Sequence, residues 1–134
     1  MNGTKIVLGL FLVVHTFLSQ GQSAEEKSGA IITFSEKIKD YGDITYGDSI
    51  SYTFKFTNTG NKDLVIQNVT TTCSCTSRKY TEVPVAPGKS GEVVVSFDSK
   101  KQEKMGRQNK AITIFSNATN KIEQVFLICN VLPK

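Results

Sequence analysis

The sequence lacks most of the residue types and motifs from which common active sites are built. Its 134 residues include no tryptophan and a single histidine, His15, which lies in an N-terminal apolar segment. A Ser-His or Cys-His nucleophile pair needs a histidine as its base, so the remaining chain cannot supply one. No glycine-rich phosphate loop precedes a helical pattern, and the acidic residues form no recognisable glycosidase pair. We therefore expect a protein that is not an enzyme.

Strong charge is also missing. The 16 Lys and Arg residues against 12 Asp and Glu residues give a formal net charge of only +4, and the cations are dispersed. This excess is too small to predict a nucleic-acid partner. The one concentrated basic segment, KKQEKMGRQNK at 100–110, lies between two strand-like runs. We expect it to form a solvated hairpin rather than an anion-binding surface.

Long apolar runs are absent as well. The longest, Ile6 to Leu18, is shorter than the roughly 20 residues that a membrane-spanning helix needs. Lys5 precedes this run and the small residues Gly21 and Ser23 follow it, which is the layout of a cleavable secretory signal. The sequence thus predicts a signal peptide at 1–23, a flexible lead-in at 24–30 and one domain at 31–134. The protein would be exported to the periplasm or the cell exterior without a transmembrane span, with a retained N-terminal anchor as the alternative.

Strand patterns fill the rest of the chain. In 49–57 apolar residues such as Phe54 and Phe56 alternate with polar ones, as in a half-buried strand. Similar short runs recur without a convincing amphipathic helix, which predicts two antiparallel sheets packed face to face. The seven expected strands lie at 31–34, 38–44, 49–57, 64–69, 93–97, 111–115 and 122–131.

Two turns appear between these strands. Asn58, Gly60 and Asn61 tolerate positive φ and predict a hairpin that joins 49–57 to 64–69. Pro87-Gly88 fits the central positions of a type II turn.

An ordered set of motifs resembles the bacterial domain of unknown function family 1573 (DUF1573). The set comprises Asp40-Tyr41-Gly42, the Phe-x-Asn-Thr-Gly segment with Asn58 and Gly60, Cys73-Ser74-Cys75-Thr76 and Pro87-Gly88. The resemblance covers nearly the whole expected domain. It implies a secreted immunoglobulin-like β-sandwich of about seven strands, distantly similar to major sperm protein, ASH and pilus-chaperone domains. It implies structural roles for Asp40, Gly42, Asn58, Gly60, Thr76, Pro87 and Gly88, and no established activity.

The chain departs from the family pattern at its cysteines. Ser74 replaces the usual Gly between Cys73 and Cys75, and Cys129 stands where the family usually has Gly. A bridge between Cys73 and Cys75 is feasible but strained by its spacing, and it would be open to thiol exchange. Alternatively, Cys129 pairs with one of them and closes a loop worth about 4 kcal/mol. Two nearby thiolates also suit Cu(I), with Cys129 as a third ligand.

Two functional hypotheses follow. The first is an exported β-sandwich that binds an unknown envelope protein or serves as a structural module, without a cofactor. Strand addition would use an edge near Ile31 to Phe34 or the final strand. The second is a thiol protein that binds Cu(I) or exchanges electrons through Cys73, Cys75 and Cys129.

Overall fold

The computed structural model describes Gly3, residues 28–102 and residues 104–134. Apart from Gly3, the expected signal peptide lies outside the described residues, as does the lead-in up to residue 27. No helix among the described residues has the length and apolar character that a membrane crossing requires.

Eight strands and one short 3₁₀ helix make up the described part of the chain. They are β1 (Ile32–Phe34), β2 (Ile38–Thr45), β3 (Ser49–Asn58), β4 (Ile66–Thr71), β5 (Thr76–Tyr80), β6 (Ser90–Asp98), η1 (Ser99–Lys101), β7 (Gly106–Ser116) and β8 (Ile122–Leu132). The added strand is β5, whose polar sequence TSRKY carries no apolar alternation. Backbone pairing with β6 therefore defines this strand, and its side-chain pattern does not reveal it.

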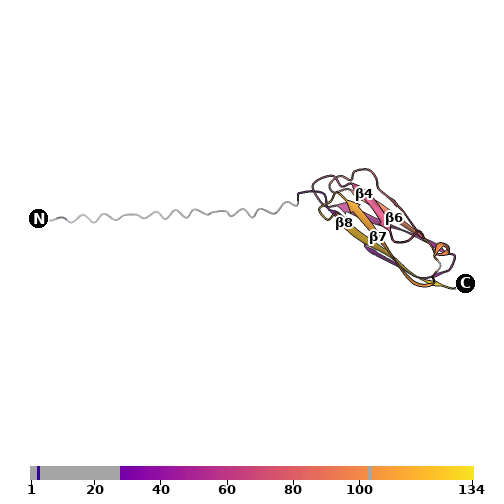
Figure 1. Ribbon diagram of the computed structural model, residues 1–134. Coiled ribbons are helices and arrows are strands. Elements are labelled where there is room, and N and C mark those ends of the chain that lie inside the picture. The colour runs from indigo at the N-terminus through magenta and orange to yellow at the C-terminus, as the bar shows by residue number, and fades with distance from the viewer. Residues whose placement is uncertain (1–2, 4–27, 103) are drawn as a thin grey trace.

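The strands form two four-stranded sheets. Sheet A has the order β1-β3-β6-β5 and sheet B the order β2-β8-β7-β4. All pairs are antiparallel except β2 with β8, which run parallel. The expected immunoglobulin-like β-sandwich is confirmed. In Figure 1 the sandwich is elongated, and the chain enters it at one end and finishes at the other.

The core lies between the two sheets and follows the alternation in the sequence. Phe54 and Phe56 of β3 are fully buried, as expected from their period of two. The Phe34 and Phe56 rings meet edge to face at a centroid distance of 5.6 Å. Burying such rings contributes roughly 1.5–3 kcal/mol each, so this layer holds the sheets together. The other fully buried large side chains are Phe97, Leu64, Ile112, Ile114, Leu127, Val69, Val93, Val95, Val125 and Val131.

The expected hairpin after β3 is wrong. β3 belongs to sheet A and β4 to sheet B, so the segment between them crosses from one sheet to the other. The reason lies in Gly60, which does not have positive φ. A Cβ there would lie 2.1 Å from the Gly29 carbonyl oxygen, so this glycine allows two backbone segments to touch. Close approach, rather than a tight reversal, sets the path of the chain.

The expected lead-in also ends earlier than predicted. Ala30 is buried, and its carbonyl accepts from Thr119 N–H at 2.9 Å. Gly29 exchanges hydrogen bonds with Asn61 through its N–H and its carbonyl. These contacts place residues 29 and 30 in the domain.

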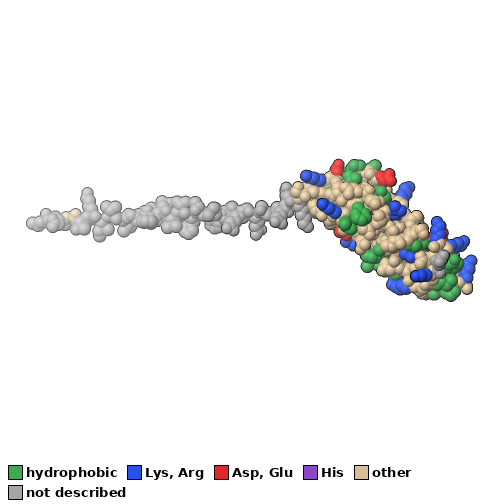
Figure 2. Space-filling model, viewed as in Figure 1, with side chains coloured by type: hydrophobic (Ala, Val, Ile, Leu, Met, Phe, Trp, Pro, Cys, Tyr) green, Lys and Arg blue, Asp and Glu red, His purple; other side chains and the backbone are tan. Residues whose placement is uncertain are grey.

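The basic segment 100–110 is not a hairpin either. It begins within η1 and ends in the first part of β7, and it links β6 in sheet A to β7 in sheet B. Its last residue, Lys110, is only 7% exposed because it occupies an inward position of β7. The segment is therefore an inter-sheet crossing whose final cation enters the core. Figure 2 shows basic side chains over both ends of this face of the molecule.

Candidate functional site

The Cys-x-Cys loop connects β4 of sheet B to β5 of sheet A. Cys73 and Cys75 form a disulfide, with their Cα atoms 5.2 Å apart. The loop is held by its own backbone, because the Cys73 carbonyl accepts from Thr76 N–H at 3.2 Å and from the Thr71 hydroxyl at 3.2 Å. Thr76, the last residue of the motif, is buried at the start of β5. The structure thus gives the motif a local pairing and a fixed place at the sandwich edge.

The two sulfurs differ in their surroundings. Cys75 is only 2% exposed, whereas Cys73 is half-buried and lines a shallow hollow with Thr72, Ser74, Gln102, Lys104 and Lys110. The Cys75 N–H donates to the Cys73 sulfur at 3.1 Å. Solvent therefore reaches the pair from the Cys73 side.

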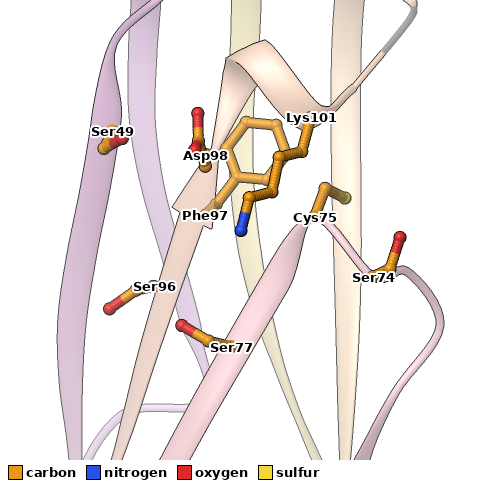
Figure 3. A pocket seen from close by; sticks show the side chains of 8 residues that line it. All are labelled: Ser49, Ser74, Cys75, Ser77, Ser96, Phe97, Asp98 and Lys101. Atoms are coloured by element: carbon orange, nitrogen blue, oxygen red, sulfur yellow. The ribbon is translucent and has the colours of Figure 1, made fainter.

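A second hollow lies on the other side of Cys75, at the outer surface of sheet A. It is lined by Ser49, Ser74, Cys75, Ser77, Ser96, Phe97, Asp98 and Lys101. Figure 3 shows the Lys101 side chain extending over this hollow between Phe97 and Cys75. Its lining combines serine hydroxyls, the Asp98 carboxylate and the Lys101 ammonium with the apolar surface of Phe97 and Cys75.

Lys110 is the functional candidate that the sequence reasoning missed. Its ammonium donates to Gln102 Oε1 at 3.0 Å and to Gln108 Oε1 at 3.3 Å, and it lies 5.1 Å from the centre of the Phe97 ring. Burial lowers the pKa of this lysine below its ordinary value. The ion pairs formed by the described residues are Lys37 with Glu123 and Arg107 with Asp40, so none of their carboxylates faces Lys110.

Gln102 joins this lysine to the disulfide. Its Oε1 atom, which accepts from Lys110, lies 3.2 Å from the Cys75 sulfur and 3.5 Å from the Cys73 sulfur. One amide oxygen therefore contacts the cation and both sulfurs.

Cys129 does not pair with the other cysteines. It is a buried free thiol on β8, where it lies opposite Gln108 of β7. Burial raises the pKa of this thiol, against the opposing effect of Lys110. Within the part of the chain that the structure describes, no three Cys, His, Asp or Glu side chains gather as metal ligands. The three-cysteine Cu(I) site is not assembled with this disulfide present, and it stays a prediction for the reduced protein.

The other motif residues occupy two places. Asp40 and Gly42 lie in β2, where the register shifts between Asp40 and Asp43. Asp40 accepts from Gly42 N–H at 2.8 Å and pairs with Arg107 at 2.9 Å. The Gly42 amide first, and Arg107 second, hold the pKa of Asp40 below its usual range. This motif forms a β-bulge, which is a structural role.

Asn58 meets the Pro-Gly turn in the crossing between the sheets. The fully buried Asn58 amide donates to the carbonyls of Lys62 at 2.7 Å and Val85 at 2.9 Å. Gly88 has φ 78°, and Lys89 N–H bonds the Ala86 carbonyl at 3.0 Å, which confirms the type II turn. The Gly88 N–H donates to the Asn58 carbonyl at 2.8 Å, so the two motifs brace each other.

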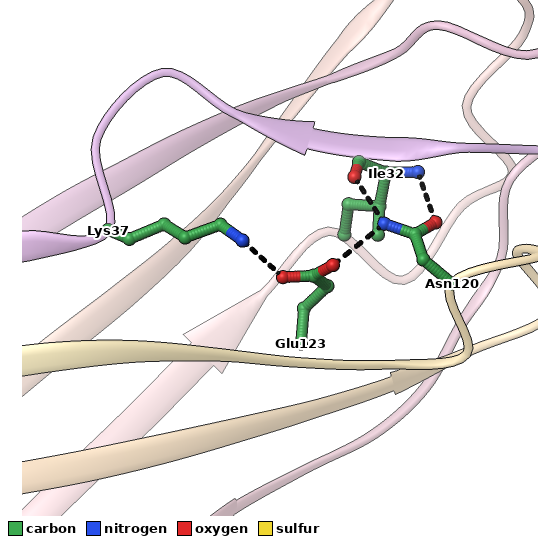
Figure 4. Close-up of polar contacts among 4 residues, drawn as sticks. All are labelled: Ile32, Lys37, Asn120 and Glu123. Carbon is green, nitrogen blue, oxygen red and sulfur yellow. Dashed lines mark hydrogen bonds and ion pairs between the residues drawn. The ribbon is translucent and has the colours of Figure 1, made fainter.

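The free edges of the sheets differ from those expected. The final strand, β8, is flanked by β2 and β7, so its prediction as an edge acceptor is wrong. β1 is an edge, but the Asn120 amide accepts from Ile32 N–H at 3.1 Å and donates to the Ile32 carbonyl at 2.8 Å. Figure 4 shows this cap, in which the Asn120 amide also donates to Glu123 and Glu123 is paired with Lys37. Asn120 thus takes the place of a neighbouring strand.

β5 forms the opposite edge of sheet A. Asp98 N–H bonds the Cys75 carbonyl and Thr81 N–H bonds the Glu92 carbonyl, both at 3.0 Å. Because backbone direction alternates along a strand, Ser77 and Lys79 also face β6, and Arg78 and Tyr80 face outward. Among the described residues, no partner bonds the outward backbone groups of Arg78 and Tyr80.

Solved structures of several different proteins share this fold. A protein of unknown function from Porphyromonas gingivalis W83 matches with a TM-score of 0.69 at 16% identity. The alignment covers 83% of this chain and 51% of that one, so the chain spans about half the length of this neighbour. The ASH/PapD-like domain 7 of human CEP192 matches with a TM-score of 0.62 at 8% identity, over 100% and 98% of the two chains.

A third neighbour is the periplasmic chaperone SfaE, with a TM-score of 0.56 at 7% identity over 75% of this chain and 58% of that one. At such identities these likenesses establish the fold alone. A search of curated protein sequences found no match. The profile of the DUF1573 family matches residues 32–131, which confirms the expected resemblance. Because this match covers most of the chain, the protein belongs to DUF1573, a family of proteins of unknown function.

Proposed function

We propose that the chain is an exported, non-enzymatic β-sandwich module that binds a protein of the cell envelope by strand addition at β5. The observation that carries this proposal is the outward row of backbone groups at Arg78 and Tyr80. An unpaired edge of this kind can accept an extended segment of another chain as an added strand.

The other edges are less suited to a partner. Asn120 caps Ile32 on β1, as described above. In the middle of β4, the Val69 N–H donates to Asn68 Oδ1 at 2.9 Å, and the Val69 carbonyl accepts from Arg78 Nε. The bulge around Gly42 interrupts β2. On β5 the outward groups of Thr76 are bonded by Cys73 and Thr71, but those of Arg78 and Tyr80 are bonded by no described residue, so these two positions are where a strand would add.

The charge of β5 limits its partners. Arg78 and Lys79 place cations on this edge, and the strand is exposed apart from its ends. Edge cations discourage pairing with a second copy of the same strand, because like charges would then face each other. They favour an extended segment that carries acidic residues.

Export is supported by the N-terminal pattern of Lys5, an apolar run and small residues. That a periplasmic chaperone shares the fold is consistent with an envelope location. A role without Ser-His or Cys-His nucleophilic catalysis is supported by the lack of histidine after residue 15.

A proline at position 78 tests the proposal. Arg78→Pro removes an outward N–H and leaves the bonds to β6 in place, whereas the matched control Arg78→Lys keeps both the N–H and the positive charge. We expect wild type and Arg78→Lys to enrich the same envelope proteins in a pull-down, and Arg78→Pro to lose them. Equal enrichment by the folded Arg78→Pro variant would rule out strand addition at β5.

A further inference from the structure

The disulfide, Gln102 and Lys110 form one cluster at the end of the sandwich that carries the Cys-x-Cys loop. We propose that Cys73 and Cys75 are a thiol–disulfide exchange site for a protein dithiol, with Lys110 as the positioning cation for the Cys75 sulfur. This chemistry goes beyond the binding role proposed above and does not depend on it.

The buried position of Lys110 calls for an anion. A lysine this far inside a protein is costly unless it is paired, and an apolar residue of similar size would stabilise the core better. Two amide oxygens and the Phe97 ring hold the ammonium in the oxidised state, without a carboxylate among the described residues. When the disulfide opens, a thiolate on Cys75 would place a negative charge near this ammonium.

Distances place the Cys75 sulfur within range of this cation. Gln102 Oε1 lies 3.0 Å from the ammonium nitrogen and 3.2 Å from the Cys75 sulfur. The ammonium is therefore at most about 6 Å from that sulfur, a range in which a cation favours the thiolate. The Cys73 sulfur already accepts the Cys75 N–H at 3.1 Å, a bond that strengthens when its acceptor is charged.

The exposure of the two sulfurs sets the direction of attack. A partner thiolate reaches Cys73 through the hollow lined by Ser74 and Lys104, because Cys75 is covered. Its sulfur bonds to the Cys73 sulfur as the Cys73–Cys75 bond breaks, and the electron pair leaves on Cys75 beside Lys110. The partner's second thiolate then attacks the mixed disulfide and releases Cys73. Overall, two electrons and two protons pass from the partner dithiol, which becomes a disulfide, to Cys73 and Cys75.

The remaining charged groups do not replace Lys110. The Lys101 and Lys104 side chains are exposed, so solvent screens them more than the buried Lys110. Asp98 accepts from Lys100 N–H at 2.9 Å, and Arg107 is paired with Asp40. Cys129 is a buried free thiol on β8, opposite Gln108. Its burial keeps it protonated and away from the incoming partner.

Dithiothreitol serves as a small dithiol probe in the first test. The exported protein, folded and in a Cys129→Ala background, is treated with it, quenched by alkylation and mapped by mass spectrometry. We expect Lys110→Met to be reduced about fivefold more slowly than the parent, because a Cys75 thiol of higher pKa is a poorer leaving group. The control Lys110→Arg keeps the charge and should stay within about threefold.

A second measurement covers the case in which Lys110→Met does not fold. The pH dependence of alkylation is recorded on the reduced wild-type protein, whose Cys73 or Cys75 should react with a midpoint below the about 8.5 of a free cysteine. A midpoint at or above that value would overturn the proposal. Equal reduction rates for folded Lys110→Met and its parent, or a disulfide that dithiothreitol opens only in denaturant, would overturn it as well.

Discussion

At the residue scale, several motif positions act through backbone contact. Gly60 lets the crossing after β3 touch the N-terminal segment, since a Cβ would lie 2.1 Å from the Gly29 oxygen and 2.6 Å from the Ile31 nitrogen. Backbone atoms cannot retreat as the end of a flexible side chain can. This glycine is therefore required by space and not by its φ angle.

Gly60→Ala tests this contact. We expect the free energy of unfolding to fall by about 2 kcal/mol or more, because two backbone segments must separate. Urea denaturation measures the change. The control is Gly42→Asn, since Gly42 has φ 67° and open space around it, and asparagine tolerates that conformation at a cost of about 0.5 kcal/mol. Equal losses in the two variants would contradict the account.

Some residue roles were readable from the sequence and others were not. Pro87-Gly88 specified its turn through φ preferences that act locally. Asn58 was predicted as a turn residue, yet its amide is buried and bonds distant carbonyls, which no local pattern reveals. Lys110 looked solvated because it ends a basic run. In β7 every second residue points inward, and Lys110 shares this alternation with Ile112 and Ile114. A predicted strand that began at Gly106 rather than at Ala111 would therefore have placed Lys110 inside.

At the element scale, the two edge strands of sheet A differ in whether a side chain bonds their outward backbone groups. β1 is closed by Asn120, which is fixed by a hydrogen bond to Glu123 at 2.9 Å, and Glu123 is paired with Lys37 at 2.5 Å. Burial alone opposes ionisation of Glu123, but the bonds from Lys37 and Asn120 prevail and lower its pKa. The cap on β1 thus depends on a charged carboxylate.

This dependence predicts a pH effect on stability. Because the folded pKa of Glu123 is depressed, its contribution is fully present above the unfolded value of about 4.3 and is lost as pH falls through the folded value. Glu123→Gln should therefore be less stable than wild type at pH 7, with a difference that shrinks below about pH 4. Urea denaturation across this range measures it. A difference that stays constant with pH would show that the charge is unimportant.

Elements were predicted unevenly from the sequence. Runs such as β3 and β6 were found because their inner residues alternate with polar ones. β5 was missed because TSRKY has no apolar face to bury, and its backbone bonds to β6 hold it in the sheet. A strand defined by pairing leaves no period in its side chains.

At the scale of the whole molecule, alternation was enough to predict a sandwich but not the partners of each strand. The segment after β3 reads as a reversal, and only the packing of distant residues 29 to 31 shows that it crosses between sheets. The cysteine pairing was open for the same reason. Three cysteines permit several bridges, and the fold selects the local one by placing Cys129 in β8 as a buried free thiol.

The local bridge predicts a modest effect on global stability. In the chain-entropy model a three-residue loop is worth about 1.5 kcal/mol, against about 4 kcal/mol for a bridge to Cys129. Urea denaturation of Cys129→Ala with and without reductant should show the smaller loss, with the cooperative transition retained. A loss near 4 kcal/mol in wild type that disappears in Cys129→Ala would indicate the long-range bridge instead.

Amide hydrogen exchange of the unbound protein tests the open β5 edge most directly. The Ile32 N–H, bonded to Asn120, should exchange at least about tenfold more slowly than the N–H groups of Arg78 and Tyr80, and Asn120→Ala should remove that protection. That result would leave β5 as the edge available to a partner. Protection at Arg78 and Tyr80 equal to that at Ile32 would mean that the β5 edge is already covered, and the binding account would be wrong.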